Sequence, residues 1–252
     1  MEAPLFGSIE RQTQEFAQRI ENLLTGVLGE PTGAYVAQPE YKYQRFGRIA
    51  YVIKQKSPHG ILLRSFGTPI LRLSLEFQCS GVEEHSWLRI EKSSILLATD
   101  EGHEILFHYD FIRDTRSQIP SAHINVNGSN DAATRLLLLC GTGKRGKSRR
   151  KDYLDKGEYP TFSTLHLPVG GDRFRPGLED VLQLAAYEFQ IDTRDGWQDV
   201  IESSREEYRK RQLGALVHEF PDIAFETLKD DGYVTGSAPS RPDKDRNRLR
   251  KY

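Results

Sequence analysis

The chain has 252 residues, of which 37% are hydrophobic, and its formal net charge is −1. These values are usual for one large or two small folded domains, and no apolar run reaches the roughly 18 residues that span a bilayer. The N-terminus carries Glu2 and no apolar signal core, and Cys79 and Cys140 form no ligand-spaced cluster. We therefore expect a cytoplasmic protein with no membrane partner, in which Cys79 is a buried thiol.

The near-neutral total charge conceals two basic segments on an acidic body. Residues 144–151 (KRGKSRRK) carry six positive charges and no acid, and the tail 235–252 carries a net charge of +4. Removing these ten charges leaves −11 on the remaining 226 residues. An acidic body repels phosphate backbones, so any nucleic-acid partner would bind these two segments. The alternative is that both segments are solvated appendages and that the partner is a protein.

The first predicted element is an amphipathic helix over residues 8–25. Apolar residues recur there at spacings of three and four, Ser8 can cap the start, and Gly26 can end the helix. A Gly/Pro-rich loop, GEPTGAYVAQPE, follows it.

Residues 48–127 then show period two, which predicts a sheet. Connections between the runs are short, which favours antiparallel pairing. The clearest strand is Leu71–Cys79, where apolar and polar residues alternate. The other predicted strands are Ile49–Lys54, Ile61–Ser65, Trp87–Lys92, Ile95–Thr99, Ile105–Phe111 and Ala122–Asn127.

Residues 141–160 contain GTGKRGKS, which fits the phosphate-loop pattern G-x-x-x-x-G-K-[ST] after a predicted buried strand, Leu136–Cys140. In such a loop Lys147 would reach the terminal phosphates and Ser148 would hold magnesium. The next residues, RRKDYLDKGEYP, are too charged and too few for the helix that the motif requires. We therefore favour a basic loop here, with nucleotide binding as an alternative.

The remaining elements are a last strand and three helices. The strand is predicted at Phe162–Val169, and the helices begin near Leu178, Trp197 and Pro221. We expect an α+β fold over residues 1–234, with a mainly antiparallel sheet, an N-terminal helix and a C-terminal group of helices packed on it. The tail 235–252 has little to bury and is predicted to be disordered.

Three stretches between about His123 and Val234 carry a family resemblance: SAHINVNG, LHLPVGGDRFRPGLEDVLQL and SREEYRKRQLGALVHEFPDIAFETLKDDGYV. Through them the chain resembles an uncharacterised family of actinobacterial proteins. The resemblance implies that the basic segment is a variable linker between two shared blocks. It implies boundaries and no chemistry.

The strongest chemical hypothesis concerns the segments FHYDFIRD and SAHINVNG. Residues two apart on a strand share a face, so His108 and Asp110 point one way and, on the next strand, His123 and Asn125 do so too. If these strands form a hairpin, the two polar pairs become neighbours. His108, Asp110 and His123 could then act as a catalytic acid–base set, or His108, His123 and His166 could hold a divalent metal.

Two further interpretations rest on short motifs. The tyrosine–aspartate strand before a histidine strand resembles small toxin-type proteins of bacterial toxin–antitoxin pairs, which implies a nuclease role, although position 125 is Asn rather than a second His. In GGDRFRP, Arg173 and Arg175 could bind an anion before a helix N-terminus. Their alternative role is pairing with acids of the body such as Glu179 or Asp180.

Three functions therefore stay open. The favoured one is a non-enzymatic, cytosolic interaction or regulatory protein. The others are a metal-dependent hydrolase or toxin-type nuclease that uses the histidines, and a nucleotide-binding protein that uses Lys147 and Ser148. The sequence alone does not decide whether the protein is an enzyme.

Overall fold

The computed structural model describes most of the chain. The described residues are 8–29, 34–36, 40–45, 48–82, 87–101, 104–113, 115, 119–128, 131–139, 144–161, 164, 167–169 and 175–240. In chain order the elements are α1 (Ile9–Leu28), β1 (Glu40–Arg45), β2 (Arg48–Lys54), β3 (Ile61–Ser65), β4 (Thr68–Val82), β5 (Arg89–Thr99), β6 (Ile105–Ile112), β7 (Ala122–Val126), α2 (Asp131–Leu139), α3 (Lys144–Lys156), β8 (Leu167–Pro168), α5 (Leu178–Glu188), α6 (Trp197–Glu219) and α7 (Pro221–Asp230).

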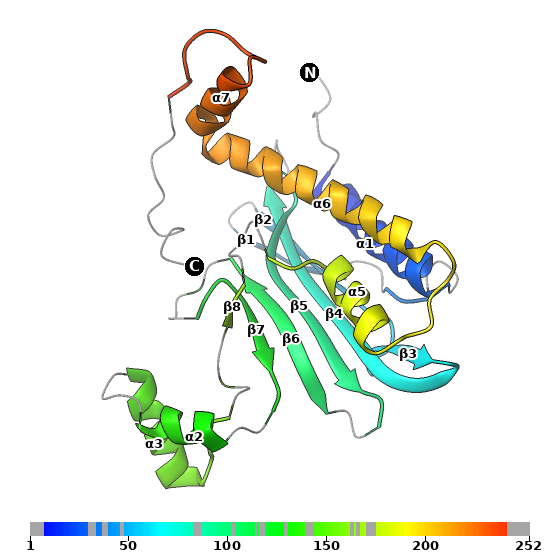
Figure 1. The fold of residues 1–252 in the computed structure, drawn as a ribbon, viewed down its shortest axis with the longest axis vertical. Helices are drawn as coiled ribbons and strands as arrows, with labels where there is room; N and C mark the ends of the chain where they lie inside the picture. Colours follow the sequence, from blue (N-terminus) through cyan, green and yellow to red (C-terminus); the bar gives the residue numbers. More distant parts are fainter. Residues whose placement is uncertain are drawn as a thin grey trace.

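The strands form one antiparallel sheet, as the sequence predicted. Its order is β1-β2-β4-β5-β6-β7-β8, and β3 pairs with β4 beside this path. Figure 1 shows β4, β5 and β6 as its long central strands. The expected α+β class with a mainly antiparallel sheet is therefore confirmed.

Two strand predictions needed correction. The predicted runs Trp87–Lys92 and Ile95–Thr99 are joined in the single strand β5, which begins at Arg89, because pairing with β4 continues through Ser93 and Ser94. A register shift between Gln78 and Cys79 accommodates the extra residue on β5. Strand β1 was not predicted, since in its sequence EYKYQR only Tyr41 and Tyr43 alternate with polar residues, and it lies at the sheet edge.

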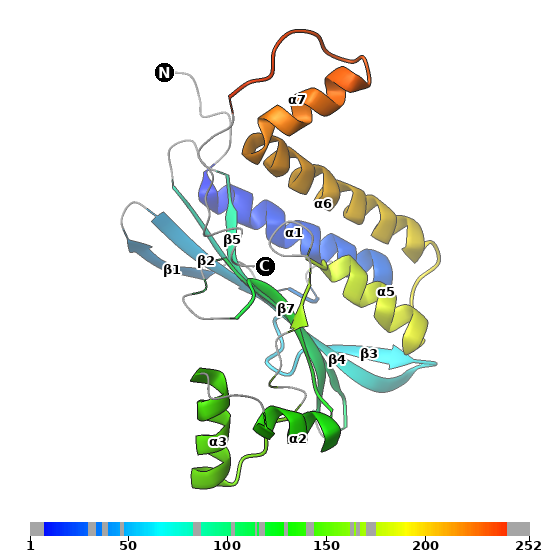
Figure 2. The same cartoon turned by 60° about the vertical axis from the view of Figure 1, so that its left-hand side comes forward.

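One face of the sheet is covered by α1, α5 and α6, which share a single hydrophobic core with it (Figures 1 and 2). Sheet residues of this core include Leu73 and Leu97, which are fully buried. Burying a side chain of this size stabilises a fold by about 1.5–3 kcal/mol. The core therefore fixes which face of the sheet is left for polar residues.

Helix α1 begins as predicted but ends later. The Ser8 hydroxyl accepts a hydrogen bond from the Arg11 amide at 3.2 Å, which caps the start. The helix runs through Gly26 and ends at Gly29, whose φ of +81° suits glycine. A Cβ at position 26 would lie 2.6 Å from a Val200 methyl, so Gly26 lets α6 approach α1 closely.

The segment around the basic residues also differs from the prediction. The predicted strand Leu136–Cys140 is wrong, because Asp131–Leu139 forms helix α2, and the predicted basic loop contains helix α3. Alanine and leucine in α2, and lysine and arginine in α3, are strong helix formers. Figure 1 shows α2 and α3 as a pair that stands away from the other helices.

The C-terminal helices α5, α6 and α7 were predicted correctly in position. The last strand was predicted too long, since the described part of Phe162–Val169 has strand pairing only at Leu167 and Pro168. Residues 235–240 form no helix or strand, and the rest of the predicted tail lies outside the described residues. Over the described chain, no helix combines the length and apolar character needed to cross a membrane.

Candidate functional site

The histidine hypothesis depends on a hairpin between β6 and β7, and that hairpin is present. His108 lies opposite Asn125, and Asp110 lies opposite His123. Directly opposite residues of antiparallel strands share a face, so these four side chains are neighbours, as expected. The intervening Phe107 and Tyr109 pack against the hydrophobic core on the other face.

His108 and Asp110 form the exposed half of this cluster. His108 Nδ1 lies 2.9 Å from Asp110 Oδ2, and the two side chains are 31% and 22% exposed. The hydrogen bond to Asp110 raises the pKa of His108 above its ordinary value, although partial burial acts in the opposite direction. An aspartate that holds one ring nitrogen leaves the other nitrogen of His108 to accept or give a proton.

The carboxyl group of Asp110 has three polar neighbours. Burial alone would raise its pKa, but hydrogen bonds from His108 and from Ser94 on β5 outweigh burial and lower it. Asp110 is therefore a carboxylate at neutral pH. This is the arrangement of a general base and its orienting partner.

His123 has a different role from the one predicted. The residue is buried, with 2% of its surface exposed. Its Nδ1 lies 2.9 Å from the Pro120 carbonyl oxygen, so Nδ1 carries the proton and donates a hydrogen bond to this oxygen. Its Nε2 lies 3.8 Å from Asp110 Oδ2. His123 is therefore buried beside Asp110 and is hidden from a substrate.

The predicted metal site is not supported. Across the residues that the structure describes, no group of three or more His, Cys, Asp or Glu side chains is arranged to hold a metal ion. His108 is bonded directly to Asp110, and Nδ1 of His123 is occupied by a carbonyl oxygen. The third predicted ligand, His166, lies outside the described residues.

The described residues do not have the strand–loop–helix arrangement that a phosphate loop requires. A phosphate loop follows a buried strand and opens a helix, whereas here α2 precedes the motif. Lys147 and Ser148 lie inside α3, at its fourth and fifth residues, rather than at its start. The Ser148 hydroxyl donates to Asp152 Oδ2 at 3.4 Å, so it serves its own helix.

Arg175 contacts an aromatic ring. Its guanidinium carbon lies 3.8 Å from the ring centroid of the buried Phe111, and its carbonyl oxygen accepts a hydrogen bond from the Tyr208 hydroxyl. The acids proposed as its partners are used elsewhere, because Glu179 accepts from Ser204 and Asp180 pairs with Arg205. Arg173 lies outside the described residues.

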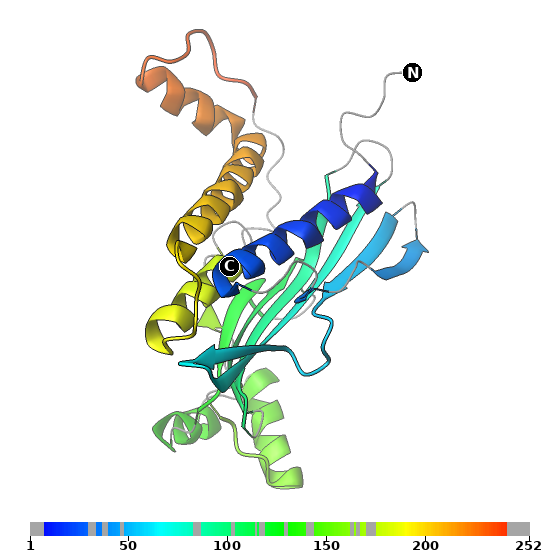
Figure 3. The same ribbon diagram turned by 90° about the vertical axis from the view of Figure 1, so that its right-hand side faces the viewer.

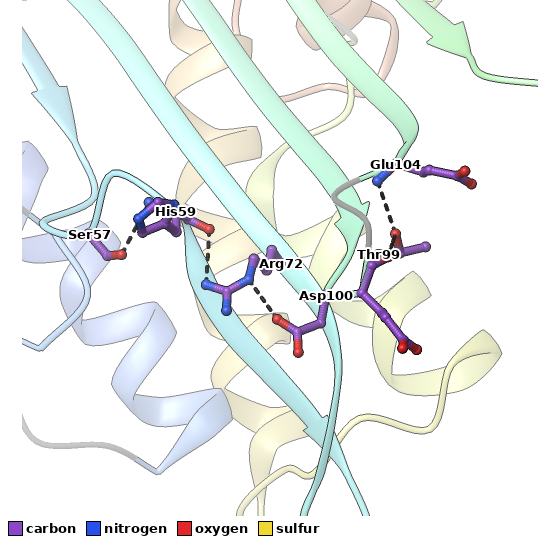
Figure 4. A network of polar contacts seen from close by, with 7 residues as sticks. Ser57, His59, Arg72, Thr99, Asp100 and Glu104 are labelled. Carbon is purple, nitrogen blue, oxygen red and sulfur yellow. Dashed lines mark hydrogen bonds and ion pairs between the residues drawn. The ribbon is translucent and has the colours of Figure 1, made fainter.

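A second polar network, which the sequence did not reveal, lies at one end of the sheet (Figure 4). Arg72 Nε lies 2.6 Å from Asp100 Oδ1, and Arg72 Nη1 donates to the His59 carbonyl oxygen at 3.2 Å. The network ties the β2–β3 connection to the end of β5. Only the pairing of β4 with β5 brings Arg72 and Asp100 together, which explains why a local pattern could not predict it.

The most unusual surface lies at the end of the C-terminal helices. Over its 23 residues α6 buries only Trp197 and Ile201, and α7 buries no side chain. We call residues 212–230, the last turns of α6 together with α7, the arm. The arm extends from the end of the molecule opposite to α2 and α3 in all three ribbon views (Figures 1–3). Its exposed apolar side chains are Leu213 (62%), Val217 (42%), Ile223 (55%) and Leu228 (44%).

Comparison with known proteins gave no relative. No family model, no curated protein and no solved structure matches the chain. The resemblance to an actinobacterial family therefore stays a prediction, and the function is inferred from the residues of this chain.

Proposed function

We propose that the protein is a non-enzymatic interaction protein of the cytosol and that the arm binds a protein partner. The single observation that carries this proposal is the exposure of four large apolar side chains on helices that bury almost nothing. Leu213 and Val217 are one turn apart on α6, and exposed apolar surface of this kind marks interaction sites, because water contact leaves its burial energy unused.

The shape of α6 supports the same function. Its first half is held to the body by Trp197 and Ile201, and by contacts of Ser204 and Arg205 with α5. Beyond Tyr208, whose hydroxyl donates to the Arg175 carbonyl oxygen, the helix continues to Glu219 with Leu213 and Val217 exposed. A helix of this length is stable only with tertiary contacts or a partner on its apolar residues.

A double variant tests whether the arm residues serve the fold or a partner. Leu213→Glu with Val217→Glu should leave the thermal unfolding midpoint of the purified protein unchanged, since neither side chain is buried. A photo-crosslinking residue at position 217, introduced into the full chain in its own cells, should give an adduct of defined mass. The same residue at exposed Glu188 on α5 is the matched control.

Two results would argue against the proposal. A large fall in the unfolding midpoint of the double variant would show that the arm packs within the chain. Equal adducts at positions 217 and 188 would show that the arm has no special partner.

A second candidate function is acid–base hydrolysis, which the 2.9 Å contact between His108 and Asp110 favours. The exposed imidazole would activate water or a hydroxyl, and Asp110 would hold its tautomer. Asp110→Asn should then lower the rate with a panel of ester and phosphodiester substrates by about 100-fold or more. A wild-type protein that turns over none of these substrates would leave the pair a structural feature.

The basic segments are the third element of the proposal. Helix α3 and the tail 235–252 would provide cationic surface for a protein or nucleic-acid partner. Removal of residues 235–252 should reduce the salt dependence of nucleic-acid retention if the tail contributes, and should leave it unchanged if it does not.

A further inference from the structure

We infer that the arm of one copy docks on helix α3 of a second copy, so that copies associate head to tail. This inference rests on the proposed function of the arm and names its partner. Helix α3 and helix α7 carry opposite charge. By sequence α3 has seven basic and two acidic residues, whereas residues 221–231 have four acidic and one basic.

Helix α3 is poorly stabilised on its own. Its first turn contains no acid and begins with Lys144 and Arg145, although a helix N-terminus favours negative charge. Lys147 and Lys151 stand one turn apart on the same side, which adds repulsion between like charges. An anionic surface beside α3 would relieve both effects.

The exposed stripe of α3 is basic and ends in an apolar residue. Lys147, Lys151 and Leu154 follow one another at spacings of four and three, so they share a face, and all three are exposed. Leu154 is 77% exposed. Within the described chain neither Lys147 nor Lys151 forms an ion pair.

The exposed stripe of α7 is the reverse of this pattern. Ile223, Glu226 and Asp230 follow at spacings of three and four, share a face and are all exposed. In the part of the chain that the structure describes, neither acid forms an ion pair. The apolar residue Ile223 is the first of the α7 stripe, whereas the apolar residue Leu154 is the last of the α3 stripe.

The two stripes match in one antiparallel register. If Leu154 lies against Ile223, then Lys151 lies against Glu226. Lys151 is three residues from Leu154 toward the N-terminus of α3, and Glu226 is three residues from Ile223 toward the C-terminus of α7. The same register then places Lys147 against Asp230. It also sets the positive N-terminus of α3 beside the negative C-terminus of α7, which is favourable.

One molecule cannot make this contact with itself. The arm and α3 lie at opposite ends of the long axis in every ribbon view (Figures 1–3). The contact must therefore join two copies. In such a pair, one copy keeps its α3 stripe unused and the other keeps its α7 stripe unused. Such a heterologous contact produces chains or rings rather than a closed two-fold dimer.

The contact is small, so the association should be weak and sensitive to salt. Interfaces below about 1,200 Å² are typical of transient complexes. Two ion pairs at the surface are screened when the Debye length falls to about 3 Å in 1 M salt. The average molar mass of the full chain should therefore rise with concentration in about 50 mM salt and return to the monomer value in about 1 M salt.

Charge reversal in sedimentation equilibrium tests the register. Lys147→Glu with Lys151→Glu, or Glu226→Lys with Asp230→Lys, should each weaken self-association by about tenfold or more. The helix dipole favours a Glu near the start of α3 and a Lys near the end of α7, so both helices should persist. An equimolar mixture of the two variants should restore association, because each restores the opposite charge for the other.

The matched control is Glu188→Lys with Asp195→Lys. It changes the net charge as Glu226→Lys with Asp230→Lys does, but at exposed positions outside both stripes. This control should associate as the wild type does. A wild type that stays monomeric, reversals without effect, or a mixture that fails to associate would each overturn the inference.

Three further outcomes separate this inference from its alternatives. A monomeric wild type that retains a fluorescent single-stranded RNA, and loses it on Lys147→Glu with Lys151→Glu, would make nucleic acid the occupant of α3 and overturn the second-copy partner. Adducts at position 217 with a different protein would overturn self-association while leaving the proposed function of the arm intact. Loss of both self-association and position-specific adducts would remove the arm as a binding surface.

Discussion

Helices α1 and α6 have 20 and 23 residues, yet they relate to the rest of the molecule in opposite ways. Helix α1 buries side chains along its whole length, from Ile9 to Val27. Helix α6 buries two near its start, and Leu213 and Val217 in its last turns are exposed. An apolar stripe thus predicts that a helix needs a partner, but not whether that partner lies in the same chain.

The largest expected difference between the two regions is in thiol reactivity. Burial raises the pKa of Cys79 to about 12, and the nearby Glu91 acts in the same direction. At pH 8 the thiolate fraction of Cys79 should therefore be about 1,000-fold below that of an exposed cysteine. In a Cys140→Ser background, Leu213→Cys should label at least that much faster than Cys79.

Stopped-flow labelling with a chromogenic disulfide measures both rates. The Cys79→Ser variant, with Leu213→Cys present, assigns the fast phase to the arm. Fast labelling of Cys79 in the native protein would contradict its place in the packed region.

Truncating a core residue gives the next largest effect. Leu24 of α1 is fully buried, so Leu24→Ala should lower the free energy of unfolding by about 2–5 kcal/mol. Leu213→Ala, the same change on the arm, should stay within about 0.5 kcal/mol of the wild type. Urea unfolding followed by circular dichroism compares them, and equal losses would remove the distinction between the two helices.

Removing the carboxylate of Asp192, which lies between α5 and α6, should have an intermediate effect on stability. Asp192 accepts hydrogen bonds from the backbone amides of Phe66 and Gly67 at 2.7 and 2.8 Å, and Phe66 has a φ of +49°. Asp192→Ala should lower the free energy of unfolding by about 1–3 kcal/mol, because two amides lose their acceptor. Hydrogen exchange of these two amides should accelerate, whereas exchange in α1 should not.

The smallest expected effect is the pH dependence that His108 and Asp110 add to stability. The raised pKa of His108 adds stability below pH 6.5 that is lost as the pH rises through the folded value. The lowered pKa of Asp110 adds stability above pH 3.8 that is lost as the pH falls through its folded value. The contribution of the pair should therefore be greatest between about pH 4 and 6.5.

Asp110→Asn isolates this contribution, which should be about 1 kcal/mol or less because both groups are partly exposed. The difference in unfolding free energy between wild type and variant should shrink above pH 6.5 and below pH 4. A difference that does not change with pH would show that the pair contributes no charge interaction.

Local periodicity predicted much of the fold. The alternation of Leu71–Cys79 gave the face of β4 correctly, and the spacing of His108 and Asp110 gave their shared face. Both follow from the two-residue period of a strand, which needs no knowledge of its neighbours. The same reasoning gave the positions of α5, α6 and α7, whose stripes follow the helical period.

The candidate site was predicted only in part. The sequence placed His108, Asp110 and His123 together, but gave no sign that His123 is buried and bound to the Pro120 carbonyl. Nor did it show Ser94 beside Asp110, because β5 and β6 choose their register through the whole sheet.

By itself, then, the sequence determined which residues share a face of a helix or strand, because side-chain direction repeats with the backbone. The tertiary structure decided which faces meet: it extended α1 past Gly26 to fit α6, turned the basic segment into a projecting helix and left the arm without cover. These outcomes depend on contacts between residues far apart in the chain, whose free energies no local pattern contains.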